Sequence, residues 1–185
     1  MKRQQLLLLI LAFGVFSILN TEMGIIGILP MAAEMYQVDI VQAGMLVSLF
    51  ALGVAIAGPT MPLLFSRFNR KHVMLLVLGV FTICNALAAV ASDFRLLLVL
   101  RVVPAFFHPV YCALAFSVAA ASVAPEDAPR AVARINMGVA AGMVIGVPIS
   151  NVLAATFDFS AAMVFFAGVT GLMFLLTMAF VPDLP

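Results

Sequence analysis

Six stretches of about 20 apolar residues follow one another along the chain, separated by short breaks that carry charges or turn-forming residues. A helix needs about 20 mostly apolar residues to cross a bilayer, because each residue adds only ~1.5 Å to its length. Of the 185 residues, 65% are apolar and 9% are charged, whereas a soluble domain has about 45–50% and about 25%. No soluble fold could bury this much apolar surface. The sequence therefore predicts an all-α membrane protein.

The six predicted transmembrane helices are expected to form one unit over residues 1–185. Membrane-spanning β-strands would give segments of ~10 residues with alternating polarity, and the sequence has none. The breaks between the apolar stretches are too short to fold independently. We therefore expect a single six-helix transmembrane bundle. Its spans are expected at about residues 5–29, 43–65, 72–91, 94–123, 131–157 and 160–181.

The distribution of basic residues predicts the orientation of the bundle. Lys and Arg are concentrated before the first span and in the second and fourth loops, and short loops of this kind face the cytoplasm. We therefore expect both termini in the cytoplasm. The basic residues concerned are Lys2, Arg3, Arg67, Arg70, Lys71, Arg130 and Arg134. The opposite loops hold Glu34, Asp39, Asp93 and Asp158, with Arg95 as their only basic residue.

Two charged residues interrupt the apolar spans. Glu22 lies in the outer half of the first span and Arg101 in the outer half of the fourth, at comparable depth. A charge at such a depth costs at least ~2.5–3.5 kcal/mol. One interpretation is a structural ion pair that locks the two helices together. The interpretation we favour is that Glu22 exchanges a proton near neutral pH, while Arg101 keeps its charge and acts as a charge partner or substrate clamp.

The fourth span extends this polar region. Arg101, His108 and Cys112 recur at helical spacing with Tyr111 alongside, so they share one face of the helix. We expect this face to point into the bundle or a cavity, with His108 as a second proton-coupling candidate. Large amides in other spans either line the same cavity or bond neighbouring helices. The predicted cavity-lining residues are Asn20, Asn85, Tyr111, Cys112 and Asn151.

The fifth span carries a helix-packing pattern. Small residues four positions apart form a groove in which another helix backbone can approach closely. They are Gly138, Gly142, Gly146 and Ser150, and Pro148 beside them predicts a bend. At the start of this span we expect Asp127 to cap the helix and Pro129 to lie in its first turn.

Several other functions are excluded by what the sequence lacks. It has no H-E-x-x-H motif, no phosphate loop and no serine–histidine signature, so we expect no enzymatic activity. Cys84 and Cys112 fall inside apolar runs and resemble small buried hydrophobes. We therefore expect no metal site and no cofactor. A net charge of +1 without a long basic run argues against nucleic-acid binding.

Three motifs together resemble the N-terminal half of a major facilitator superfamily transporter, in the drug:proton antiporter branch near its arabinose-efflux-permease-like members. The segment TEMGIIGILPMAAEM resembles the branch's first-span signature, whose acidic position falls on Glu22. LRVVPAFFHPVY resembles its fourth-span motif, whose arginine falls on Arg101. GMVIGVP is similar to its fifth-span antiporter motif, with glycines at Gly142 and Gly146.

The loop between the second and third spans resembles the superfamily's gating loop, G-x-L-a-D-r-x-G-r-k, only in part. PLLFSRFNRK keeps the basic residues Arg67, Arg70 and Lys71. The glycine, aspartate and second glycine of the motif are replaced by Pro62, Ser66 and Asn69. The usual acidic gating contact of this loop is therefore not expected here.

The resemblance implies a proton-coupled efflux transporter that exports a small organic molecule, a drug or sugar, by alternating access. It also implies twelve spans in two halves, so a second six-span unit is an expected partner besides substrate, protons and the lipid bilayer. That unit would be a second copy of this chain or a separate C-terminal half. The alternative function is a non-transporting membrane scaffold in which Glu22 and Arg101 form a structural lock.

Overall fold

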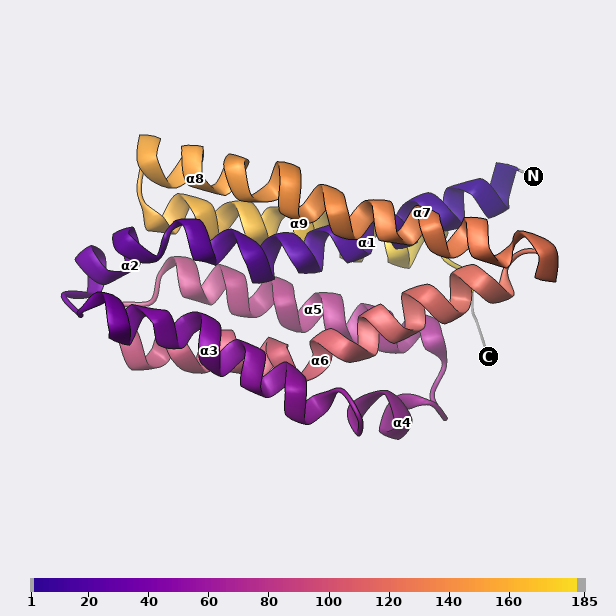
Figure 1. The fold of residues 1–185 in the computed structure, drawn as a ribbon, viewed down its shortest axis with the longest axis horizontal. Coiled ribbons are helices and arrows are strands. Elements are labelled where there is room, and N and C mark those ends of the chain that lie inside the picture. Colours follow the sequence, from indigo (N-terminus) through magenta and orange to yellow (C-terminus); the bar gives the residue numbers. More distant parts are fainter. Residues whose placement is uncertain (1, 183–185) are drawn as a thin grey trace.

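A computed structural model describes residues 2–182 as a bundle of long helices (Figure 1). Six helical stretches are long and apolar enough to cross a membrane. They are Arg3–Gly27, Ile40–Ala57, Arg70–Ala89, Phe94–Ala121, Pro125–Thr156 and Phe159–Phe180. No strand occurs among the residues that the structure describes. The predicted all-α, six-helix transmembrane fold is confirmed.

The helices are numbered along the chain. Five spans contain one long helix each: α1 (Lys2–Gly27), α3 (Ile40–Ala57), α5 (Arg70–Ala89), α6 (Phe94–Ala121) and α9 (Phe159–Phe180). The fifth span joins α7 (Ala128–Ala141) to α8 (Val147–Thr156) through a π-helical turn, η2 (Gly142–Gly146). The short elements are α2 (Leu29–Tyr36), α4 (Met61–Phe65) and the 3₁₀ turn η1 (Pro125–Asp127).

Helix breaks fall inside two of the spans that the hydropathy pattern predicted. The first was expected to reach residue 29, but α1 ends at Gly27 and a new helix starts with Pro30 in its first turn. Proline has no N–H to continue the helical bonding of the preceding turn. The second was expected at 43–65, but it divides into α3 and α4 around the turn at residues 58–60. Apolar character continues through both breaks, so composition alone does not locate them.

Acidic residues cap the helices that start at one end of the bundle. The carboxylates of Asp39, Asp93 and Asp158 accept backbone hydrogen bonds at the starts of α3, α6 and α9, at 2.7, 3.1 and 2.8 Å. We call this end the acidic end. The opposite end, which holds Arg3, Lys71 and Pro182 around one hollow, is the basic end. Figure 1 shows the start of α1 and the α6–α7 connection at that same end.

The predicted cap of the fifth span is wrong. Asp127 precedes α7, but its side chain makes no capping hydrogen bond. Its carboxylate accepts a hydrogen bond from the Arg130 guanidinium at 3.4 Å instead. Because the η1 turn runs directly into α7, Asp127 already has helical backbone angles, unlike the extended residue that caps a helix well. Pro129 lies in the first turn as predicted.

The glycines of the fifth span form the seam between α1 and α7–α8. A Cβ at Gly138 would overlap the carbonyl group of Ala12, and a Cβ at Gly146 would overlap the amide of Asn20. Gly142 lies against the carbonyl oxygen of Phe16, 3.0 Å from where its Cβ would stand. These glycines let the two helix backbones touch, which is how membrane helices associate without a hydrophobic driving force.

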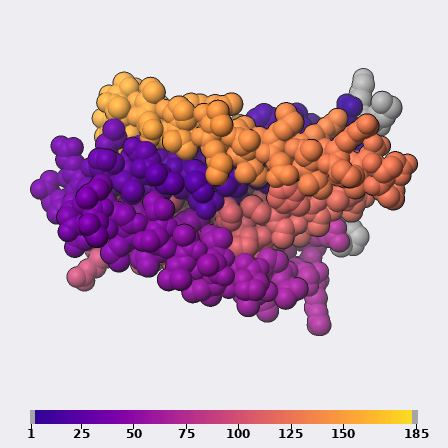
Figure 2. Space-filling view, viewed as in Figure 1, coloured from indigo at the N-terminus to yellow at the C-terminus, as the bar shows by residue number. Residues whose placement is uncertain are grey.

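Helix α1 is the centre of the bundle. It contacts α6 on one side and α7, α8 and α9 on others, while α3 packs on α6 and α5 packs on both α6 and α9. Figure 2 shows α3 and α7–α8 on the visible face, flanking α1 and α6. Large apolar side chains remain exposed on these outer helices, as expected where they meet lipid.

We expect Gly138→Ala to destabilise the bundle by about 1–3 kcal/mol, because the added methyl group forces the α1 and α7 backbones apart. Thermal unfolding of purified protein in detergent measures the effect. Gly168→Ala in α9 is the matched control, since nothing lies within 4 Å of its added Cβ. Equal unfolding temperatures for the two variants would contradict the proposed role of the seam.

Candidate functional site

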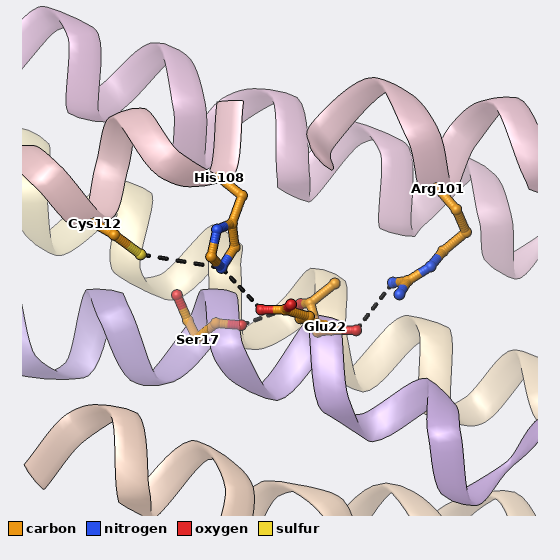
Figure 3. Close-up of polar contacts among 6 residues, drawn as sticks. Ser17, Glu22, Arg101, His108 and Cys112 are labelled. Carbon is orange, nitrogen blue, oxygen red and sulfur yellow. Dashed lines mark hydrogen bonds and ion pairs between the residues drawn. The ribbon is translucent and has the colours of Figure 1, made fainter. Parts of the chain in front are cut away.

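The centre of the site is an ion pair between α1 and α6. The Glu22 Oε2 atom lies 2.9 Å from the His108 Nε2 atom. Figure 3 draws this contact as a dashed line between the two side chains. The side chains are 17% and 11% exposed, so most of each is removed from solvent. In the described part of the chain the only other ion pair, Asp127 with Arg130, lies at the exposed basic end. Glu22 and His108 are therefore the one ion pair among those residues that is mostly removed from solvent.

The His108 ring is held on two further sides. The Cys112 Sγ atom, one turn along α6, lies 4.0 Å from the same Nε2 atom. The Phe50 ring of α3 meets the imidazole edge to face, with 6.0 Å between ring centroids. Within the described residues, His108 Nδ1 is buried without a hydrogen-bond partner. The imidazole is thus oriented toward Glu22, with Nε2 as its interacting nitrogen.

Arg101 contacts the residue next to Glu22, not Glu22 itself. Its Nη1 atom donates a hydrogen bond to the Thr21 carbonyl oxygen at 2.9 Å, and its guanidinium lies 4.9 Å from the centre of the Phe50 ring. The side chain is 1% exposed, so its charge is almost completely desolvated. In residues 2–182 no Glu22–Arg101 contact reaches salt-bridge distance. The direct lock considered from the sequence is absent, and a cation adjacent to the carboxylate replaces it.

Two residues that the sequence did not single out complete the site. Thr21 offers its carbonyl to Arg101, donates its hydroxyl to the Ser17 carbonyl at 3.1 Å and accepts from the Asn85 amide at 3.3 Å. Phe50 covers both Arg101 and His108. Thr21 stands beside Glu22 in the first-span motif, which is a signal that could have identified it. Phe50 is one apolar residue in an apolar helix, so no signal marks it.

The predicted cavity-lining residues lie in two kinds of place. Asn20, Asn85 and Tyr111 are buried between helices. Asn20 packs on Gly146 and the Tyr111 hydroxyl packs on Gly14, because glycine leaves room for them. Cys112 and Asn151 are partly exposed, and Cys112 alone of the predicted set adjoins the Glu22–His108 pair.

The gating-loop candidates lie at the basic end, away from the ion pair. Arg67 is in the turn between α4 and α5, while Arg70 and Lys71 begin α5. No carboxylate of the described residues is within salt-bridge distance of these three side chains. Asn69, which replaces a glycine of the family motif, caps α5 by accepting a hydrogen bond from the Lys71 backbone at 3.0 Å.

Among residues 2–182, no group of three His, Cys, Asp or Glu side chains is placed to hold a metal ion.

We expect a double-mutant cycle of Glu22→Gln and His108→Gln to give a coupling energy of about 1–3 kcal/mol, because the pair is mostly desolvated. Thermal unfolding in detergent at neutral pH measures all four proteins. The matched control is the cycle of Asp127→Asn and Arg130→Gln, which breaks an exposed pair and should give a coupling near zero. Equal coupling energies in both cycles would show that the Glu22–His108 contact stabilises the protein no more than the exposed Asp127–Arg130 pair does.

Comparison with known proteins places the chain in a family. The chain is 35% identical over 161 residues to the "Inner membrane transport protein YdhP" of Escherichia coli (strain K12), covering 87% of this chain and 41% of YdhP. It is 24% identical to the "Probable sugar efflux transporter" of Helicobacter acinonychis (strain Sheeba), covering 95% of this chain and 45% of that protein. The chain therefore spans less than half of these relatives.

The fold agrees with this relationship. A crystal structure of a bacterial homologue of the human lysosomal transporter Spinster, inward-facing and unoccupied, superposes with a TM-score of 0.81 at 19% identity. The superposition covers 99% of this chain and 44% of that one. Residues 11–185 match the Major Facilitator Superfamily. The chain therefore belongs to the Major Facilitator Superfamily.

Proposed function

We propose that this chain is half of a proton-coupled secondary efflux transporter, or a half-size one, working by alternating access. The observation that carries the proposal is the 2.9 Å contact between Glu22 and His108 inside the bundle. A titratable carboxylate and a titratable imidazole are expensive to keep in a membrane interior and mark proton pathways there. Histidine changes charge near physiological pH, so the pair suits a proton that is taken up and released in each cycle.

Each charged side chain has a distinct part in this proposal. Glu22 takes up the proton and becomes a neutral carboxylic acid. It then no longer attracts His108 as an anion, so the two side chains separate. Arg101 keeps its charge at all relevant pH values, so it remains as a fixed cation beside the Thr21 carbonyl when Glu22 is neutral. Protonation of Glu22 thus makes the net charge between α1 and α6 more positive, while the charge of Arg101 stays the same.

The substrate class is proposed from relatives. The Helicobacter relative is named as a sugar efflux transporter and the Escherichia relative as an inner membrane transport protein. We therefore propose export of a small organic molecule, a sugar or a drug, across a bacterial inner membrane, with both termini in the cytoplasm. Asn20, Asn85, Asn151, Tyr111 and Cys112 remain candidates for the substrate region, and Arg67, Arg70 and Lys71 for gating. No enzymatic activity is part of the proposal.

The second candidate is a non-transporting scaffold. In that case the buried contacts would only hold α1 against α6, through the Glu22–His108 pair and the Arg101–Thr21 hydrogen bond. Such a lock needs no proton exchange. Transport driven by a proton gradient separates the two functions.

We expect Glu22→Gln to abolish accumulation driven by a proton gradient while retaining exchange of substrate across the membrane at equal pH. Everted membrane vesicles with an acidic interior, supplied with radiolabelled arabinose or ethidium as probes, measure both activities. Gln keeps the size of Glu but cannot exchange a proton, so coupling is lost and binding is retained. His108→Gln should weaken the gradient-driven activity without abolishing the exchange.

The matched control is Glu34→Gln, which removes a carboxylate in α2, outside the site. It should accumulate both probes like the unchanged protein. Gradient-driven accumulation by Glu22→Gln at the unchanged rate would refute proton coupling through this residue. If Glu22→Gln lost both the exchange activity and the gradient-driven accumulation, the result would indicate a structural role for Glu22 instead.

We propose a second six-span unit as the partner that completes the transport path. Relatives extend well beyond the stretch matched here, and transporters of this type work by rocking two units about a central site. A homodimer and a pairing with a separate C-terminal half are both compatible with this proposal.

Co-expression of two copies with different affinity tags distinguishes these two partners. Capture of one tag from detergent-solubilised membranes should recover the other if the unit is a homodimer, because both copies then share one complex. Mixing separately expressed membranes after solubilisation is the control, since it should give no joint capture. Recovery of a different six-span polypeptide would identify a C-terminal half, and recovery of neither would exclude a stable second unit.

A further inference from the structure

Helix α3 meets α6 along one narrow stripe of buried residues. An added Cβ at Gly53 would lie 3.0 Å from the Cβ atom of Ala105, which shows how closely the two helices approach. Phe50 is the only aromatic residue of α3, and it is 2% exposed, so its ring lies inside this contact. The buried residues of α3 recur every three or four positions and therefore share one face of the helix. They are Ala43, Leu46, Phe50, Gly53 and Ala57.

The Phe50 ring contacts two side chains of the candidate site. The Arg101 guanidinium lies 4.9 Å from the ring centre, where the negative face of a π-system attracts a cation. The His108 ring meets Phe50 edge to face, with 6.0 Å between centroids and 80° between the ring planes. Arg101 and His108 are seven residues apart, about two turns of α6. One ring from α3 thus lies against both of them.

Arg101 has donors that no hydrogen bond satisfies. Its Nη1 atom binds the Thr21 carbonyl oxygen, but its Nε and Nη2 atoms are buried without a partner among residues 2–182. A buried, charged donor without an acceptor is unfavourable. The carboxylate of Glu22 belongs to the residue next to Thr21 and has the opposite charge. A Glu22–Arg101 ion pair would satisfy these donors, yet none reaches salt-bridge distance in the described chain.

The identity of the cation that pairs with Glu22 decides what the pair can do. Histidine releases its proton near physiological pH, whereas arginine keeps its charge. A Glu22–Arg101 ion pair would therefore join α1 to α6 through a cation that does not titrate. Figure 3 shows Glu22 between His108 and Arg101, with its dashed contact to His108. Something in the structure favours the exchangeable partner over the permanent one.

We infer that Phe50 is a positioning residue that keeps Arg101 away from Glu22. The ring face attracts the guanidinium and holds it beside the Thr21 carbonyl, and the contact with His108 keeps the imidazole turned toward Glu22. An aliphatic side chain in the same place would exclude water but would not attract a cation. This role rests on the proposed function, because the choice of cation matters for transport only if Glu22 exchanges a proton.

Double-mutant cycles at neutral pH measure how strongly Glu22 is coupled to each cation. One cycle combines Glu22→Gln with His108→Gln, and the other combines Glu22→Gln with Arg101→Met, each by thermal unfolding in detergent. Phe50→Leu removes the aromatic face and keeps an apolar side chain. In this background we expect the His108 coupling to fall and the Arg101 coupling to rise, each by roughly tenfold as an equilibrium constant. A loss of packing that is independent of these charges cancels within each cycle.

Two matched variants test the role of the aromatic face. Phe50→Tyr retains this face, so it should retain the coupling energies of the unchanged protein. Phe81→Leu makes the leucine substitution at a fully buried phenylalanine of α5, over whose ring no cation lies among residues 2–182. It should lower the unfolding temperature and leave both couplings unchanged.

A spectroscopic measurement on the folded protein covers the case in which a variant of a cycle does not fold. The chain has two histidines, so His72→Gln leaves His108 as the only imidazole. With isotope-labelled histidine, the Nε2 resonance of His108 reports its contact with Glu22. In Phe50→Leu this resonance should move toward its position in Glu22→Gln, because the carboxylate has turned to Arg101. In Phe50→Tyr it should stay in place.

Three outcomes would overturn the inference. Unchanged couplings and an unchanged Nε2 resonance in Phe50→Leu would show that Phe50 does not determine the partner of Glu22. A fall in both couplings would show that the ring only supports packing. A Phe50→Tyr protein that behaves like Phe50→Leu would show that the aromatic face is not the cause. All of these measurements are made without a proton gradient, so their result does not depend on the transport assay that tests the proposed function.

Discussion

The cost of holding charge in a membrane governs this structure. Glu22, His108 and Arg101 are all removed from water, and an isolated charge at such a depth is strongly unfavourable. Each therefore has a partner of complementary chemistry: a carboxylate with an imidazole, and a guanidinium with a backbone carbonyl and an aromatic face. These contacts join α1, α3 and α6. The positions of the three helices therefore depend on the contacts made by these three charged or titratable side chains.

The same constraint places the other charges at the two ends. Asp39, Asp93 and Asp158 begin the helices that start at the acidic end, where each carboxylate accepts a free backbone N–H. Helix capping thus accounts for acidic residues in those loops independently of any rule about membrane orientation. The basic residues at the other end make no ion pair in the described chain apart from Arg130. They remain free to meet water, lipid headgroups or a partner.

The sequence predicts the fold well because long apolar runs have few other structures in a bilayer. It also identifies Glu22 and Arg101, since a charge inside an apolar span is rare. It does not identify their partners. Arg101 and His108 are seven residues apart on one helix, about two turns or ~10 Å. Span ends estimated from hydropathy are uncertain by a similar distance, so the sequence alone does not decide which of the two residues lies level with Glu22. Phe50 could not be predicted, because its role depends on which side of α3 faces α6. The fifth span, by contrast, is interrupted by η2 just before Pro148, beside which the sequence predicted a bend.

Helix α1 is therefore bound to its neighbours by two kinds of contact. The glycine seam toward α7 and α8 places glycines against backbone atoms and the Asn20 amide of α1, and nothing in it titrates. On the α6 side, Tyr111 packs on Gly14 toward the basic end, and the Glu22–His108 pair lies farther along. Under the proposed mechanism, neutralising Glu22 weakens only that last contact. The α1–α7 contacts then stay intact, and at the level of Glu22 only the Arg101–Thr21 hydrogen bond still joins α1 to α6, so the effect of one proton is directed to one helix interface.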